Sequence, residues 1–158
     1  MQKLQFVHLS LILGADPNAR MGKDGYSTVL HALAFKLNVN ITTTLLDMGA
    51  DPDSTDLYNN SALNLLELSA LRLSQHVQDQ IRGIDFKWRK YTNPQLPLKT
   101  DTVRWEEMYN ALNRHINDLV QLYVKAGHNL QHQNKLGRTA LHAAVVMGSI
   151  SSVETLLY

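Results

Sequence analysis

Histidines are the residues of this chain whose type and spacing come nearest to a chemical site. His128 and His132 stand four residues apart, a spacing at which two histidines on one helix can bind a metal ion. They follow Gly127, however, and a glycine in that place is typical of the residue just after a helix. We therefore predict that both histidines lie in a turn with no third ligand nearby, and that the chain binds no metal.

His31 and His142 form a second pair, since each stands in the same short motif, Thr-x-Leu-His. No nucleophile or carboxylate accompanies them in a pattern that would make either one a catalytic base. The adjacent Glu106 and Glu107 would point about 100° apart on a helix, so they do not form a cooperating acid pair. The chain also has no cysteine, no glycine-rich phosphate loop and no Gly-x-Ser-x-Gly motif. We predict that it is not an enzyme and has no cofactor or small-molecule substrate.

The composition is that of one globular domain. The 158 residues are 44% hydrophobic and carry a formal net charge of +1, which gives no general attraction to nucleic acid or to an anionic membrane. No apolar run approaches the ~20 residues that a membrane-spanning helix needs. Residues 1–15 have the lysine and the apolar stretch of a weak secretory signal. Polar residues interrupt that stretch, so we predict a helix there.

Two sequence motifs recur along the chain. The first occurs as "LILGADPNA" at 11–19, "LLDMGADPDS" at 45–54 and, more faintly, "LYVKAGHNLQH" at 122–132. The second occurs as "STVLHALA" at 27–34, "RTALHAAV" at 138–145 and, in a weaker copy, "NSALNLLE" at 60–67. Thr28 precedes Leu45 by the same distance as Thr139 precedes Leu156, so the two motifs keep one register. A fixed register of this kind predicts a repeat protein.

These motifs resemble the ankyrin repeat, in which a Thr-Pro-Leu-His-x-Ala run opens each unit of about 33 residues. Val29 and Ala140 stand where the family has proline. The resemblance implies an all-α solenoid of helix-turn-helix units, with His31 and His142 bonded to backbone between neighbouring repeats. The repeats would be a partial one at 1–15, a full one at 16–50, one at 51–127 with an insertion at 70–104, and one at 128–158 that lacks its last turn.

The residue types suit the places that this register gives them. Thr28 and Thr139 can cap the first helix of a repeat with a short polar side chain. Gly49 and Gly127 follow second helices, where a left-handed residue is needed and glycine carries no steric cost. In the second repeat Asn38 or Asn40 could adopt the left-handed conformation between the two helices. Leucines are expected to form the core shared by the repeats: Leu30, Leu45, Leu46, Leu141, Leu156 and Leu157.

An insertion of about 45 residues separates the two helices of the third repeat, since Gly127 stands 66 positions after Ser61, whereas Gly49 stands only 21 positions after Thr28 in the second repeat. Apolar residues at helical spacing predict two long helices, at about 61–82 and 105–127, that project side by side. Between them, 84–104 alternates like a strand, turns at Thr-Asn-Pro-Gln and continues as a β-rich run. We predict a β-hairpin whose return strand includes Thr100, Thr102 and Val103.

The predicted hairpin is rich in basic and aromatic residues, which dominate many binding hot spots. A simpler interpretation is that Phe86 and Trp105 form a small core and that the lysines are solvated. Residues near the tip are the better candidates for a partner site. The predicted partner-binding residues of the insertion are Phe86, Lys87, Trp88, Arg89, Lys90 and Tyr91, and those of the concave solenoid face are Tyr26, Phe35, Lys36 and Tyr58.

We therefore predict an intracellular module, in cytoplasm or nucleus, that binds another protein through the hairpin, the concave face or both. One alternative is a recruiting domain of a larger enzyme, or of an effector that a bacterium secretes into a host cell. Another alternative is nucleic-acid binding by the hairpin, through base stacking on the aromatic rings and basic contacts to phosphate. The small size of the basic patch argues against nucleic acid.

Overall fold

The computed structural model describes residues 2–21, 27–66, 69 and 99–158. Their elements are α1 (Gln2–Ile12), β1 (Arg20–Met21), β2 (Ser27–Thr28), α2 (Val29–Ala34), α3 (Val39–Asp47), α5 (Lys99–Lys125), α6 (Ala140–Met147) and α7 (Ile150–Leu157). A short helical segment at 62–66 lies between α3 and α5. The two strands pair antiparallel, with Arg20 opposite Thr28. The described part of the chain is thus mostly helical, as predicted, and the N-terminal stretch is a helix.

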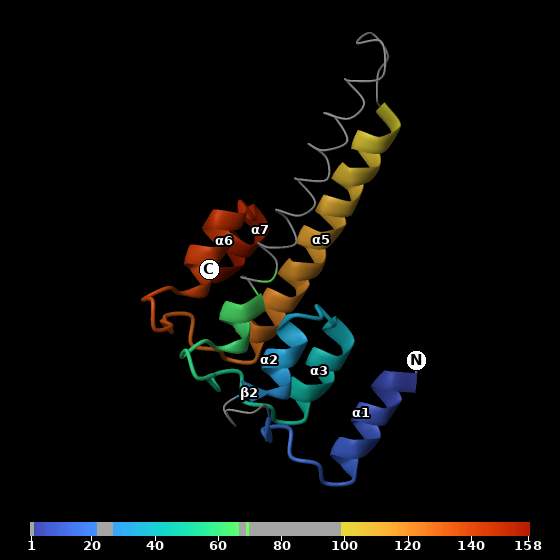
Figure 1. Cartoon of the computed structure of the whole chain (residues 1–158), viewed down its shortest axis with the longest axis vertical. Coiled ribbons are helices and arrows are strands. Elements are labelled where there is room, and N and C mark those ends of the chain that lie inside the picture. Colours follow the sequence, from blue (N-terminus) through green and yellow to red (C-terminus); the bar gives the residue numbers. More distant parts are fainter. Residues whose placement is uncertain (1, 22–26, 67–68, 70–98) are drawn as a thin grey trace.

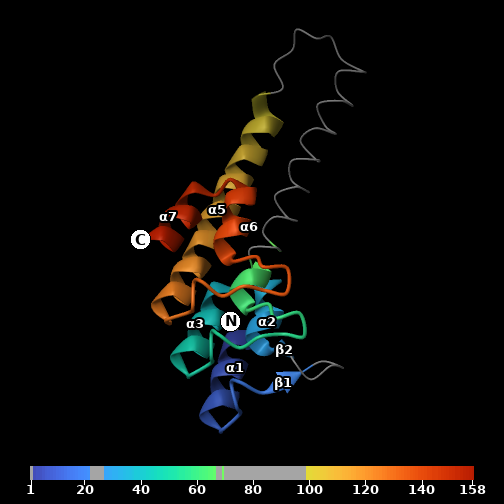
Figure 2. The same ribbon diagram turned by 90° about the vertical axis from the view of Figure 1, so that its left-hand side faces the viewer.

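The helices stack as antiparallel pairs (Figures 1 and 2). The pairs are α2 with α3, the segment 62–66 with α5, and α6 with α7. The second helix of each pair, together with α1, belongs to one continuous row, because α1 contacts α3, α3 contacts α5 and α5 contacts α7. The shorter first helices form an inner row beside the turns. This two-row stack leaves the turns and the inner helices along one side of the molecule.

Local signals begin and end the helices as the sequence predicts. Thr28 and Thr139 are the N-caps of α2 and α6, each with extended backbone. Gly49 and Gly127 follow the second helices with φ of 88° and 81°, values that suit glycine. The prediction for the α2–α3 connection was wrong, because Leu37 adopts the left-handed conformation with φ of 49°. Asn38 is instead the N-cap of α3, where its side chain accepts the Ile41 N–H at 3.0 Å.

The core lies between the two rows of helices. Leu30 and Leu45 are buried there with Leu63, Leu66 and Tyr123. Other predicted core leucines are less covered: Leu46 and Leu141 are only partly buried, and Leu157 is exposed. Leu157 lies on a face of α7 that no described helix covers, so it does not join the core formed by the described residues.

Helix α5 is longer than predicted. It begins at Lys99 and runs for 27 residues, so Thr100, Thr102 and Val103 are helical and the predicted return strand is wrong. Threonine and valine favour strands only weakly and in context, whereas each residue added to an anchored helix gains one hydrogen bond. The rest of the predicted hairpin and most of the predicted helix at 61–82 lie outside the described residues. Figure 1 shows α5 extending well beyond the other described helices.

Candidate protein-binding surface

Two neighbouring turns are built in the same way and present apolar tips. In one turn Asp56 Oδ1 accepts the N–H groups of Tyr58 and Asn60 at 2.8 Å. In the next, Asn134 Oδ1 accepts those of Leu136 and Arg138 at 2.9 and 3.1 Å. A short polar side chain that accepts two backbone donors stabilises a tight turn. Each turn therefore places one large apolar side chain, Tyr58 or Leu136, at its tip.

A left-handed residue follows each tip, Asn59 with φ of 58° and Gly137 with φ of 70°. The turns are also bonded to each other, since the Lys135 N–H donates to the Tyr58 carbonyl at 3.1 Å. Tyr58 is 64% exposed and Leu136 is 74% exposed. Because the turns are held rigidly side by side, the two side chains form a fixed apolar ridge, which we call the turn tips.

The inner helices add a second apolar surface. Phe35, the C-cap of α2, and Val146 of α6 occupy the same place in their repeats, seven residues after the capping threonine, and are 52% and 67% exposed. Ala32 and Ala143 likewise share a register, four residues after that threonine. We call these four residues the inner strip. Exposed large apolar side chains that recur at one register position indicate a surface suited to contact with another molecule.

His31 joins two neighbouring repeats. Its Nδ1 accepts the Thr28 N–H at 3.1 Å and lies 2.9 Å from Thr28 Oγ1. Since Nδ1 is an acceptor, Nε2 carries the hydrogen and donates to the Asn60 carbonyl oxygen at 3.1 Å. Burial lowers the pKa of His31, although the hydrogen bond to Asn60 and the charge of Asp56 act in the opposite direction. The histidine is therefore a neutral structural bridge, as the resemblance implied.

His142 makes only the bond to its own capping threonine. Its Nδ1 accepts the Thr139 N–H at 3.2 Å and lies 2.8 Å from Thr139 Oγ1. The side chain is exposed, and no described residue accepts a hydrogen bond from its Nε2. The described residues therefore show the bond of His142 to its own capping threonine, and the bond to a neighbouring repeat stays a prediction.

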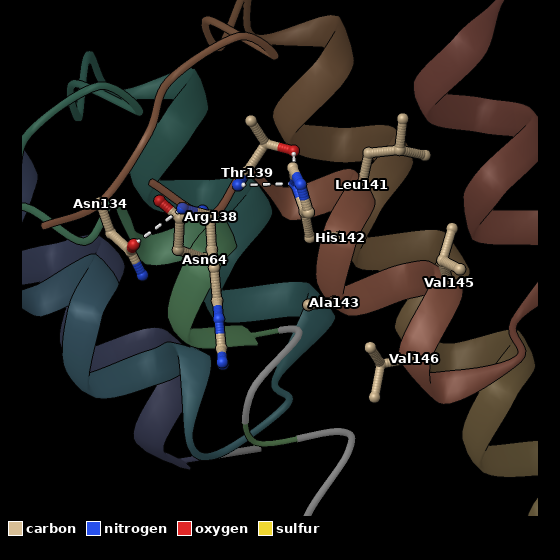
Figure 3. A pocket seen from close by; sticks show the side chains of 9 residues that line it. All are labelled: Asn64, Asn134, Arg138, Thr139, Leu141, His142, Ala143, Val145 and Val146. Carbon is tan, nitrogen blue, oxygen red and sulfur yellow. Dashed lines mark hydrogen bonds between the residues drawn. The ribbon is translucent and has the colours of Figure 1, made fainter. Parts of the chain in front are cut away.

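A groove of about 570 Å³ runs along α6 beside His142 (Figure 3). We call it the α6 groove. Leu141, Val145 and Val146 contribute its apolar part, and Arg138 lies at its other side, near Asn64 of the neighbouring repeat. None of the described residues that line this groove is acidic. It is therefore an apolar surface with a positively charged rim.

A third histidine, His128, forms a chain of contacts that sequence reasoning missed. Its Nδ1 is 2.7 Å from Asp53 Oδ1 and 3.1 Å from the Pro52 carbonyl oxygen, and its Nε2 is 3.3 Å from Ser61 Oγ. An Asp-His-Ser arrangement is found in hydrolases. Here, however, Ser61 is fully buried and its hydroxyl donates to Asn64 Oδ1 at 3.0 Å. No substrate carbonyl could reach it, so the chain of contacts is a structural tie between turns.

Burial also lowers the pKa of His128, with the nearby Asp53 carboxylate acting against that shift. His132 lies close by, and its Nε2 is 2.8 Å from the Asn59 carbonyl oxygen. Both histidines therefore hold turns, in the position predicted for them. Within the described ranges no three potential ligands come close enough to hold a metal ion.

The structure describes three of the residues that the sequence predicts to bind a partner. Phe35, Lys36 and Tyr58 are exposed on the side of the inner helices and turns. Tyr26 and the residues of the insertion from Phe86 to Tyr91 lie outside the described residues. Sequence reasoning missed Leu136 and Val146. The alignment of "RTALHAAV" with "STVLHALA" could have found Val146, because it places Val146 in the register of Phe35.

Stacked helix pairs with threonine-capped inner helices and tightly bonded turns define an α-helical repeat protein, a class that presents extended binding surfaces. Residues 114–157 match the family model described as ankyrin repeats (many copies). The chain is also 28% identical over 144 residues to the putative ankyrin repeat protein FPV115 of fowlpox virus (strain NVSL). Both comparisons therefore support the ankyrin-repeat family, which the motifs predict.

That alignment covers 81% of this chain and 26% of the viral protein, so the chain spans about a quarter of the length of its relative. Ankyrin repeats are in general modules for protein–protein interaction and are typically without enzymatic activity. Among the described residues, no helix combines the length and the apolar character needed to cross a membrane.

Proposed function

We propose that the chain binds a partner protein through the inner strip and the turn tips. The observation that supports this is the repetition of exposed apolar side chains at equivalent positions, Phe35 with Val146 and Tyr58 with Leu136. These residues come from rigid, internally bonded elements, so little entropy is lost when a partner covers them. Aromatic side chains on such a surface are the usual source of binding energy.

The experiment is quantitative capture of proteins from cell extract on the immobilised chain, with three variants in parallel. Phe35→Ala and Tyr58→Ala remove one side chain each from the inner strip and the turn tips. Leu9→Ala is the matched control, because Leu9 is an exposed apolar residue of α1, away from both surfaces. We expect a specific partner to be retained by the wild type and by Leu9→Ala and to be lost from the other two. Equal retention by all three would refute the proposal.

The basic-aromatic segment from Phe86 to Tyr91 is proposed as a second partner-binding surface. Its composition supports this, since it combines three cations with three aromatic residues. The double variant Trp88→Ala/Arg89→Ala should then weaken binding at least about tenfold without changing the melting temperature. If the ligand is nucleic acid, affinity should fall steeply and log-linearly with added salt, and if it is a protein, the response should be shallow.

The wider setting is also a proposal. A recruiting domain within a larger protein is favoured by the relative, of which the chain spans only 26%. The division into repeats at 1–15, 16–50, 51–127 and 128–158, the intracellular location and the possibility of a bacterial effector stay predictions. Expression of the chain as a fluorescent fusion, with and without the Phe35→Ala change, would test whether its location depends on a bound partner.

A further inference from the structure

The two rows of helices differ in charge (Figures 1 and 2). The three inner helical segments, α2, 62–66 and α6, contain no charged residue. The outer helices α3, α5 and α7 carry acidic residues, and those whose side chains are described and exposed include Asp47, Glu107, Asp118 and Glu154. The carboxylates of these helix pairs therefore lie on the outer row, and the inner helices present an uncharged surface.

Cations border this uncharged surface. Lys36 directly follows Phe35 of the inner strip, and Lys135 directly precedes Leu136 of the turn tips. Both lysines are exposed, and no carboxylate of the described ranges forms an ion pair with either of them. Arg20 of β1 adds a third cation beside the neighbouring turn. The apolar residues proposed to bind a partner are thus flanked by positive charge at both ends.

Asp56 is the one acidic residue of the two turns that carry the turn tips, 56–60 and 134–138. Its Oδ1 accepts the N–H groups of Tyr58 and Asn60, and its Oδ2 accepts Asn60 Nδ2 at 3.0 Å. The hydrogen-bonding capacity of this carboxylate is therefore directed into its own turn. The ammonium group of Lys135 is not bonded in this way to a described residue. A partner that approaches the turns meets cations and apolar side chains.

This surface belongs to repeats that have neighbours on both sides. Phe35 and Lys36 lie in the second repeat, whose helix α3 contacts both α1 and α5, and Tyr58 lies in the third, whose helix α5 contacts both α3 and α7. Phe35 and Tyr58 are nevertheless 52% and 64% exposed. Their exposure is therefore a property of the inner side of the stack and does not depend on an uncovered end.

We propose that the partner of the inner strip and the turn tips presents an acidic surface, in which carboxylates flank an apolar side chain. The apolar side chain would cover Phe35 or Tyr58, and the carboxylates would pair with Lys36 and Lys135. Complementary charge speeds association and disfavours wrong partners. The carboxylates of the outer row would repel the same partner, which directs it to the inner side. This inference rests on the proposed function, because it adds the charge of the partner to it.

Nucleic acid fits this arrangement less well than an acidic protein surface. Binding to a phosphate backbone needs several cations along a track, and the uncharged helices α2 and α6 interrupt such a track on the inner side. The aliphatic side chains of the inner strip neither stack on bases nor bind phosphate. An acidic protein surface supplies both the apolar contacts and the separated carboxylates.

The test is selection of a random peptide library displayed on phage against the whole chain, followed by synthesis of an enriched peptide. We expect the enriched peptides to carry aspartate or glutamate beside a leucine, isoleucine or phenylalanine. The affinity of the synthetic peptide should fall at least about tenfold for the double variant Lys36→Glu/Lys135→Glu. Both lysines are exposed, so the melting temperature should stay unchanged.

Arg114→Glu/Lys125→Glu is the matched control, because both residues are exposed cations of α5 in the outer row. It makes the same charge change and should alter the affinity by less than about twofold. A second peptide, with lysine in place of its acidic residues, should bind the Lys36→Glu/Lys135→Glu variant better than the wild type. A purely structural role of the two lysines would not produce this exchange of preference.

Four results would overturn the inference: no enrichment, enrichment of peptides without acidic residues, equal losses for the two double variants, or no exchange of preference. Tight binding of a labelled single-stranded oligonucleotide that Lys36→Glu/Lys135→Glu abolishes would also overturn it, because nucleic acid would then be the ligand. If Phe35→Ala and Tyr58→Ala still abolish partner capture in such a case, only the charge of the partner is wrong. If they do not, the proposed function fails as well.

Discussion

Replacing His31 with alanine should lower the free energy of unfolding by about 2–5 kcal/mol, as judged from the hydrogen bonds and the buried packing that it removes. The buried imidazole accepts the Thr28 N–H at 3.1 Å and donates to the Asn60 carbonyl at 3.1 Å. The buried Thr28 N–H loses its side-chain acceptor, which costs about 1–3 kcal/mol, whereas the Asn60 carbonyl oxygen still accepts the Asp56 N–H at 2.9 Å and loses only one of two hydrogen bonds. The cavity left by the ring adds to this cost, because His31 is almost completely buried between repeats.

The matched comparison is His142→Ala. That imidazole has the same bond to its capping threonine, at 3.2 Å, but no bond to a second described repeat, and it is exposed. Losing only a helix cap costs about 1 kcal/mol. Urea denaturation followed by circular dichroism should therefore give a deficit for His31→Ala that exceeds that for His142→Ala by at least about 1 kcal/mol at similar m-values.

Equal deficits for the two variants would refute this reasoning. They would mean that the bond from His31 to Asn60 contributes nothing net, and that the histidine acts only through its own helix cap. A deficit for His31→Ala below about 0.5 kcal/mol would also refute the role of the buried bond to the Thr28 N–H, since it would be smaller than the cost of one unpaired buried group.

Three further predictions concern stability. Burial lowers the pKa of His31 and His128 below the ordinary value of 6.5, so the unfolded chain takes up protons first. Stability should be full above about pH 6.5 and fall as the pH is lowered below that value, and a urea midpoint that does not change on this acidification would contradict the prediction. Leu63→Ala removes a fully buried side chain and should cost about 2–5 kcal/mol, whereas Leu157→Ala, at an exposed site, should cost less than about 1 kcal/mol in the same assay. Gly49→Ala forces an alanine to a φ of 88° and should cost about 1–2 kcal/mol, although no atom obstructs the added methyl group; a neutral change in thermal melting would mean that the turn relaxes.

Much of the fold could be predicted from sequence because its signals are local. Thr28 and Thr139 cap their helices whatever packs against them, since the bond runs to the backbone three residues on. Gly49 and Gly127 end their helices because a left-handed residue must stand there. The repetition of these signals at one spacing determined the repeat register. Phe35 and Tyr58 could be named as surface residues because the core of that register does not need them.

The places where prediction failed depend on what lies next to a residue in space. Local propensity favoured a strand at Thr100 to Val103, but the continuing helix α5 incorporated these residues. Periodicity alone cannot bury Leu157 either, because burial requires a neighbouring helix that covers it. The left-handed conformation of Leu37 likewise follows no preference of leucine, and the tertiary fold imposes it between α2 and α3.

The sequence by itself determined the helix caps, the turns and the register of the repeats, because each depends on atoms a few residues apart. Only the tertiary structure decided which side chains meet across long separations. His128 and Asp53 are 75 residues apart in the chain, yet their side chains are 2.7 Å apart. The α6 groove likewise combines Asn64 with Arg138 and Val145, from two separate repeats. Such contacts arise from the stacking of whole helix pairs, whose geometry depends on packing over the entire interface and not on any local preference.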